Sequence, residues 1–186
     1  MSPILVRPVR EQLEHDRIIR LLQAKFRRRF DVGINPGAEQ NTPFGAGPSA
    51  IYPDVVLVSQ DRGRKVMAII EVETVESVNN LEALAEWVPF GRLKSPFHLY
   101  VPTAMVEVAR RLCSDSHIPV AEIHTYHWIG DEMRFLPVYK APVDGRASSR
   151  RASAKASARQ GVATKKPAKK TAKKTAKKTG RSVKRK

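Results

Sequence analysis

The sequence predicts a mixed α/β domain over residues 1–145, followed by a basic tail over residues 146–186. Two runs rich in β-branched residues, separated by a short polar stretch, predict a β-hairpin over residues 51–75. Segments with helical spacing of apolar residues come before and after this hairpin. About 145 residues are enough for one sizeable core of this type. The predicted order of elements is α-β-β-α-β-α-β-β, around one central sheet with helices beside it.

The first predicted element is an amphipathic helix over residues 10–30. The apolar residues at helical spacing are Leu13, Ile18, Leu21, Leu22 and Phe26. The second half of this segment is basic and contains Arg27, Arg28 and Arg29. Two interpretations stay open for these arginines: a solvated helix face, or phosphate contacts beside a nucleic-acid cleft.

The elements after this helix are predicted from the positions of glycine, proline and helix-capping residues. Residues 33–50 hold four glycines and three prolines, which predicts a long loop before the hairpin. The elements expected after the hairpin are a helix over 76–90 that ends at Pro89, a strand over 97–102, a helix over 103–115 with Thr103 as N-cap, and two strands over 119–129 and 132–140.

The cysteine count and the absence of long apolar runs bound the cellular location. Cys113 is the single cysteine, so an intramolecular disulfide is excluded and a reducing compartment is indicated. The start of the chain has no continuous apolar region typical of a secretory signal. No window approaches the ~20 apolar residues that a membrane span needs. A soluble, cytoplasmic protein is expected.

The net charge of +16 comes from the tail. Residues 1–145 carry 17 Lys and Arg against 18 Asp and Glu, whereas residues 146–186 carry 17 Lys and Arg and no acid. The tail repeats Ala-Lys-Lys-Thr three times over residues 168–179 and has no aromatic residue. A segment of this composition buries too little apolar area to offset its ordering entropy, which predicts disorder when it is free.

Paired lysines along a flexible chain bind phosphates without reading bases. The tail lysines expected to do so are Lys165, Lys166, Lys169, Lys170, Lys173, Lys174, Lys177 and Lys178. The tail resembles linker-histone C-terminal tails and the lysine-rich extensions of bacterial nucleoid proteins, which implies nucleoid association. DNA is the favoured partner, with RNA and anionic membrane surfaces as alternatives. The tail has no apolar anchor, which argues against stable membrane residence.

Three carboxylates mark the ends of the predicted hairpin strands. Glu71 and Glu73 are one residue apart, so in a strand they point the same way, about 6.6 Å apart. Asp54 follows Pro53 at the head of the other strand, and hairpin register can place it close to Glu71. Buried carboxylates are costly without partners. Converging carboxylate oxygens suit Mg²⁺ or Mn²⁺ rather than zinc.

This arrangement of acids resembles the PD-(D/E)xK nuclease superfamily. The resemblance rests on Pro53-Asp54 and Glu71-Val72-Glu73 on two hairpin strands, after a first helix and before another, and it covers roughly residues 10–140. It implies a restriction-endonuclease-like fold with a mixed central sheet. By the same resemblance, Asp54 and Glu71 are metal ligands and Glu73 occupies the position that is usually lysine.

The glutamate at position 73 departs from the family pattern. A lysine from a neighbouring element can take that role, and Lys94 is the first candidate, with Arg92 second. The resemblance further implies a glutamate from the first helix near the metal, either Glu11 or Glu14. The competing interpretation of the acids is a solvated strand edge, or partners for Arg62 and Arg64.

Other clusters predict less. His124 and His127 are three residues apart in a predicted strand, so they point to opposite faces, and no cysteines lie nearby to complete a zinc site.

The carboxylates and the basic tail leave two functions open. One is a Mg²⁺- or Mn²⁺-dependent endonuclease that the tail holds on DNA. The other is a non-catalytic DNA-binding protein with an inactivated nuclease fold. The sequence leaves a homodimer open.

Overall fold

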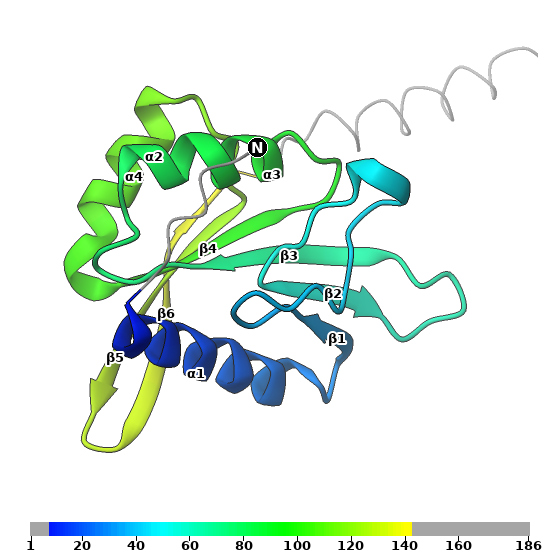
Figure 1. The fold of residues 1–186 in the computed structure, drawn as a ribbon, viewed down its shortest axis with the longest axis horizontal. Helices are drawn as coiled ribbons and strands as arrows, with labels where there is room; N and C mark the ends of the chain where they lie inside the picture. The colour runs from blue at the N-terminus through cyan, green and yellow to red at the C-terminus, as the bar shows by residue number, and fades with distance from the viewer. Residues whose placement is uncertain (1–7, 143–186) are drawn as a thin grey trace, which may run out of the picture. The chain divides into compact units, whose positions relative to one another are not determined.

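The computed structural model describes residues 8–142, in which six strands form one mixed sheet with helices on both faces (Figure 1). The strands are β1 (Phe30–Ile34), β2 (Val55–Ser59), β3 (Val66–Val72), β4 (Phe97–Pro102), β5 (Glu122–Ile129) and β6 (Glu132–Lys140), and they lie side by side in chain order. The predicted mixed α/β class is confirmed. The basic tail and its lysines lie outside the described residues.

The connections decide which strands are parallel. β1, β2 and β3 pair antiparallel, and so do β5 and β6. β4 runs parallel to both β3 and β5. Parallel pairing needs a crossover segment, and each of these two crossovers contains a helix. The carboxyl ends of β3 and β4 therefore meet at one edge of the sheet.

The first helix is shorter than predicted, and its buried face is different. Helix α1 (Val9–Phe26) ends before the three arginines, and the chain then turns directly into β1, a strand that the sequence did not predict. Leu13 is 66% exposed. The buried residues of α1 are Glu11, His15, Ile18, Ile19 and Leu22. The helix thus turns a glutamate and a histidine toward the sheet, not Leu13.

The helical segment after β3 is irregular. It consists of α2 (Asn80–Glu82), a π-helical turn η2 (Ala83–Trp87) and α3 (Val88–Gly91). Asn79 caps it, because its side chain accepts hydrogen bonds from two backbone N–H groups of the first turn. Pro89 lies in the first turn of α3 and does not end the helix, since that position needs no N–H donor.

The next helix also starts differently from the prediction. A 3₁₀ turn, η3 (Thr103–Met105), precedes α4 (Val106–Asp115). Thr103 makes no cap hydrogen bond. Instead, its hydroxyl donates to the backbone oxygen of Tyr126 at 3.3 Å. The long loop predicted over residues 33–50 is confirmed only in part. Its first two residues belong to β1, and the rest contains only the 3₁₀ turn η1 (Gly47–Ser49) and a single bridge between Phe44 and Ile51.

Two apolar cores lie on the two faces of the sheet. One core joins α1 to the sheet and includes Ile18, Ile70 and Tyr100. The other core lies under α2, α3 and α4 and includes Trp87 and Leu99. Figure 1 shows α1 on one face and the other helices on the opposite face. Alternation along β3 therefore sends Ile70 toward α1 and Glu71 toward the opposite face.

Within residues 8–142, no helix has the length and apolar character that crossing a membrane requires.

Candidate functional site

The hairpin of β2 and β3 brings Asp54 and Glu71 together. Val55 pairs with Ile70, so the residues just outside this pair, Asp54 and Glu71, are neighbours. The Asp54 backbone N–H donates to Glu71 Oε2 at 3.3 Å, and Asp54 Oδ2 accepts from the Val72 N–H at 2.8 Å. Asp54 is 7% and Glu71 5% exposed. The hairpin register thus has the effect that the sequence predicted.

Glu73 lies one residue beyond the end of β3 and is fully buried. Its backbone N–H donates to the Tyr100 carbonyl at 2.8 Å, which continues the pairing with β4. Its Oε1 accepts a hydrogen bond from the Trp87 indole N–H at 2.5 Å. The competing interpretation of a solvated strand edge is therefore wrong. Arg64 instead pairs with Asp31, at 3.1 Å on the surface.

Two side chains of helix α1, Glu11 and His15, contact this region from outside the hairpin. The Thr74 hydroxyl donates to Glu11 Oε1. His15 Nε2 lies 3.0 Å from Asp54 Oδ2, with the imidazole only 3% exposed. Glu14, the alternative to Glu11, is exposed. His15 was not predicted, although its position four residues after Glu11 and three before Ile18 puts it on the buried side of the helix.

We define the acidic cluster as Asp54, Glu71, Glu73 and Glu86, a residue of η2, because the charges of the other three act on Glu71. Its electrostatics are visible at Glu71. Burial raises the pKa of Glu71 well above its usual range, and the negative charges of Asp54, Glu86 and Glu73 raise it further. A cation placed among these carboxylates would relieve both effects, because it replaces lost solvation and offsets like-charge repulsion.

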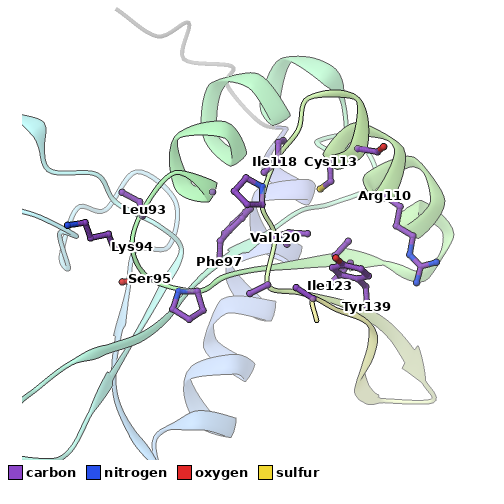
Figure 2. Close-up of a pocket in the computed structure, with 16 residues that line it drawn as sticks. Leu93, Lys94, Ser95, Phe97, Arg110, Cys113, Ile118, Val120, Ile123 and Tyr139 are labelled. Carbon is purple, nitrogen blue, oxygen red and sulfur yellow. The ribbon is translucent and has the colours of Figure 1, made fainter. Parts of the chain in front are cut away.

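Lys94 does not reach the acidic cluster, which corrects its predicted catalytic role. Lys94 precedes the start of β4, whereas Glu73 lies beside Tyr100. The three residues of strand from Phe97 to Tyr100 already span about 10 Å, and Lys94 lies further back, in the bend before β4. Lys94 instead borders a separate cavity of about 840 Å³, walled largely by apolar side chains (Figure 2). Arg92 belongs to the same end of β4.

The three arginines are also remote from the acids. Arg27, Arg28 and Arg29 are exposed and follow the C-terminal end of α1, whereas Glu11 and His15 lie near its N-terminal end. Twelve helical residues separate His15 from Arg27, which corresponds to about 18 Å along the axis. If these arginines contact nucleic acid, they do so away from the acidic cluster.

A second group of polar residues lies elsewhere on the sheet. In residues 8–142, the ligand atoms of His98, Glu122 and His124 all lie within 4.8 Å of one another, and this is the group of three with spacing for one metal ion. The predicted ligands Asp54 and Glu71 do not gather a third donor to that spacing. His127 points away from His124, as predicted, and lies 3.4 Å from the Thr103 hydroxyl.

Comparison with family models, curated proteins and solved structures found no match to this chain.

Proposed function

We propose that this protein is a metal-dependent nuclease that hydrolyses phosphodiesters and is tethered to DNA by its basic tail. The observation that carries the proposal is the buried contact between Asp54 and Glu71 at a strand end, inside a cluster of further carboxylates. Such a concentration of buried acids lowers the stability of the fold. Its presence therefore points to a function that requires these side chains. The acids also keep the hairpin context on which the PD-(D/E)xK resemblance rests.

The donor chemistry of the acidic cluster fits a hard divalent cation. All its side-chain donors are carboxylate oxygens, which Mg²⁺ and Mn²⁺ prefer. Asp54 and Glu71 would hold the ion. When bound, the ion would polarise the phosphodiester and lower the pKa of the attacking water. Asp54 is itself oriented by the Val72 N–H and by His15, so one of its oxygens has a defined direction.

Glu73 would act as the general base in place of the usual lysine. A carboxylate accepts the proton of the attacking water, whereas a lysine would stabilise developing charge. The Trp87 indole holds Glu73 Oε1 in place. Burial at Glu73 excludes bulk water around it, which strengthens every electrostatic interaction at the site.

Substrate binding is assigned to the tail. Residues 1–145 carry a net charge near zero, so they offer little attraction for a polyanion, whereas the tail carries 17 positive charges. Each phosphate that the tail neutralises releases counterions, so affinity should fall steeply as salt rises. DNA is the proposed substrate, and association with the nucleoid in the cytoplasm follows from it.

A second candidate is a non-catalytic DNA-binding protein that keeps an inactivated nuclease fold. The environment of Glu73 favours it, because the Trp87 indole occupies Glu73 Oε1 and the side chain is fully buried, away from bulk water. This candidate predicts DNA binding that depends on residues 146–186 and is indifferent to the acidic cluster.

Cleavage of plasmid and single-stranded DNA by the full-length chain separates the two. We expect cleavage with Mg²⁺ or Mn²⁺, none with EDTA, and a loss of at least about 100-fold in Glu71→Gln. Glu107→Gln is the matched control, since the Glu107 side chain is 83% exposed on α4. DNA binding without metal-dependent cleavage, unchanged in Glu71→Gln, would refute the nuclease and support the binding protein.

A further inference from the structure

A second polar cluster lies on the α1 face of the sheet, across the parallel strands β4 and β5. In the register of these strands His98 pairs with Glu122 and Tyr100 pairs with His124. Paired residues of neighbouring strands share a face, and so do residues two apart on one strand. His98, Glu122 and His124 therefore point the same way, and the 12–22% exposure of their side chains leaves them open to solvent.

The geometry of these three side chains suits one small cation. Glu122 Oε2 lies 2.9 Å from His124 Nε2 and 3.9 Å from His98 Nδ1. A tetrahedral zinc ion with bonds of about 2.0–2.1 Å holds its ligand atoms about 3.3 Å apart. These two distances lie on either side of that value, and the nitrogens of His98 and His124 are at most 4.8 Å apart, so modest side-chain rotations would bring all three donors to coordinating distance.

We infer that His98, Glu122 and His124 form a binding site for a divalent transition-metal ion of the zinc class. Two imidazole nitrogens and one carboxylate oxygen are donors that such ions prefer over Mg²⁺. Three protein ligands leave a fourth position open, as in zinc sites that hold a water or a substrate atom. The site takes its ligands from two adjacent strands and is therefore held by the sheet itself.

The surroundings orient the ligands. The Tyr100 ring is parallel to the His124 ring, with an interplanar angle of 2° and centroids 4.5 Å apart, which fixes the imidazole plane. Lys140 Nζ lies 2.9 Å from Glu122 Oε1, so Oε2 is left facing the histidines. The Tyr100 hydroxyl is buried, and within residues 8–142 it has no hydrogen-bond partner. Buried polar groups of this kind usually meet ordered water or an ion.

This zinc-class site is separate from the acidic cluster. His98 pairs with Ile70, which points toward α1, whereas Glu71 pairs with Leu99, which belongs to the core under α4. His98, Glu122 and His124 therefore lie on the α1 face of the sheet, whereas Glu71 of the acidic cluster lies on the opposite face. The substitution Glu71→Gln therefore distinguishes a metal bound among the acids from a metal bound by these three ligands.

The direct test is calorimetric titration of the full-length chain with Zn²⁺, with Mg²⁺ as a second titrant. We expect one Zn²⁺ per chain, weakened at least 10-fold by His98→Gln and by His124→Gln. Two controls should retain the affinity: His127→Gln, on the other face of β5, and Glu71→Gln, in the acidic cluster. A Zn²⁺-dependent rise in Tm should follow the same pattern.

X-ray absorption of the zinc-loaded wild-type chain reads the ligands without any substitution. Two imidazoles with oxygen donors and no sulfur is the expected shell, since Cys113 is remote from this face. The inference is overturned if the wild-type chain binds no Zn²⁺. It is equally overturned if neither His98→Gln nor His124→Gln weakens binding, or if Glu71→Gln abolishes it.

Discussion

Replacing Trp87 with Phe removes the indole N–H that Glu73 accepts at 2.5 Å, while the ring stays in the core. A hydrogen bond to a charged group contributes about 1.5–3 kcal/mol. The loss of two buried ring carbons adds about 1.5 kcal/mol, at about 0.8 kcal/mol for each. We therefore expect Trp87→Phe to lower the free energy of unfolding by about 3–4.5 kcal/mol, which corresponds to a fall of at least roughly 10 °C in Tm.

Urea unfolding followed by far-UV circular dichroism measures this loss, because the signal does not depend on tryptophan. Trp128→Phe is the matched control. Trp128 is 36% exposed and contacts the Arg17 guanidinium at 4.1 Å, so its loss should cost no more than about 1 kcal/mol. In a Glu73→Gln background, Trp87→Phe should cost about 1 kcal/mol less, because no charge is left without its donor. Equal costs for the two tryptophans would refute the assigned hydrogen bond.

Three further predictions concern single side chains. Since the pKa of Glu71 is raised in the folded state, the free energy of unfolding should fall as pH rises above about 4.3, the unfolded value, and through the folded pKa. Metal-free Glu71→Gln should then have a higher Tm than wild type at pH 7–8 and no advantage below pH 4; identical pH profiles would contradict this. Burial raises the pKa of the Cys113 thiol to about 11, so alkylation by iodoacetamide should be slow at pH 8 and fast only in urea. Rapid labelling of the native chain, measured by mass spectrometry, would be inconsistent with that burial. Asn79→Ala should cost about 1 kcal/mol by thermal unfolding, because it removes the cap of α2, whereas exposed Asn41→Ala should be neutral.

Local sequence patterns were sufficient for the strands that are bounded by short turns. Strands β4 and β6 have the bounds that the sequence predicts. The sequence did not predict strand β1, because this segment is held in a strand conformation by pairing with β2, more than 20 residues later in the chain. Its own residues are a weak strand signal, since Gly33 is the fourth of its five residues. In the structure a Cβ at Gly33 would lie 2.2 Å from the Thr42 side chain, so the glycine makes room for the folded loop.

The acidic cluster divides in the same way. Asp54 and Glu71 belong to one hairpin, and the alternation of strand residues together with a short turn brings them together. Glu11, His15 and Trp87 join them only after α1 and η2 pack on the two faces of the sheet. Lys94 was a reasonable candidate by distance in sequence, but the direction of β4 carries it to the opposite end of the strand.

The sequence by itself determined the α/β class, the hairpin that joins Asp54 to Glu71, and the location of the positive charge in the tail. The tertiary structure alone decided that Glu73 is buried against Trp87 and that His98 meets Glu122 and His124. The physical reason is the length of the crossovers. Parallel strands are joined through helices, so residues that face one another across β4 and β5 lie more than 20 positions apart, and no local spacing encodes their contact.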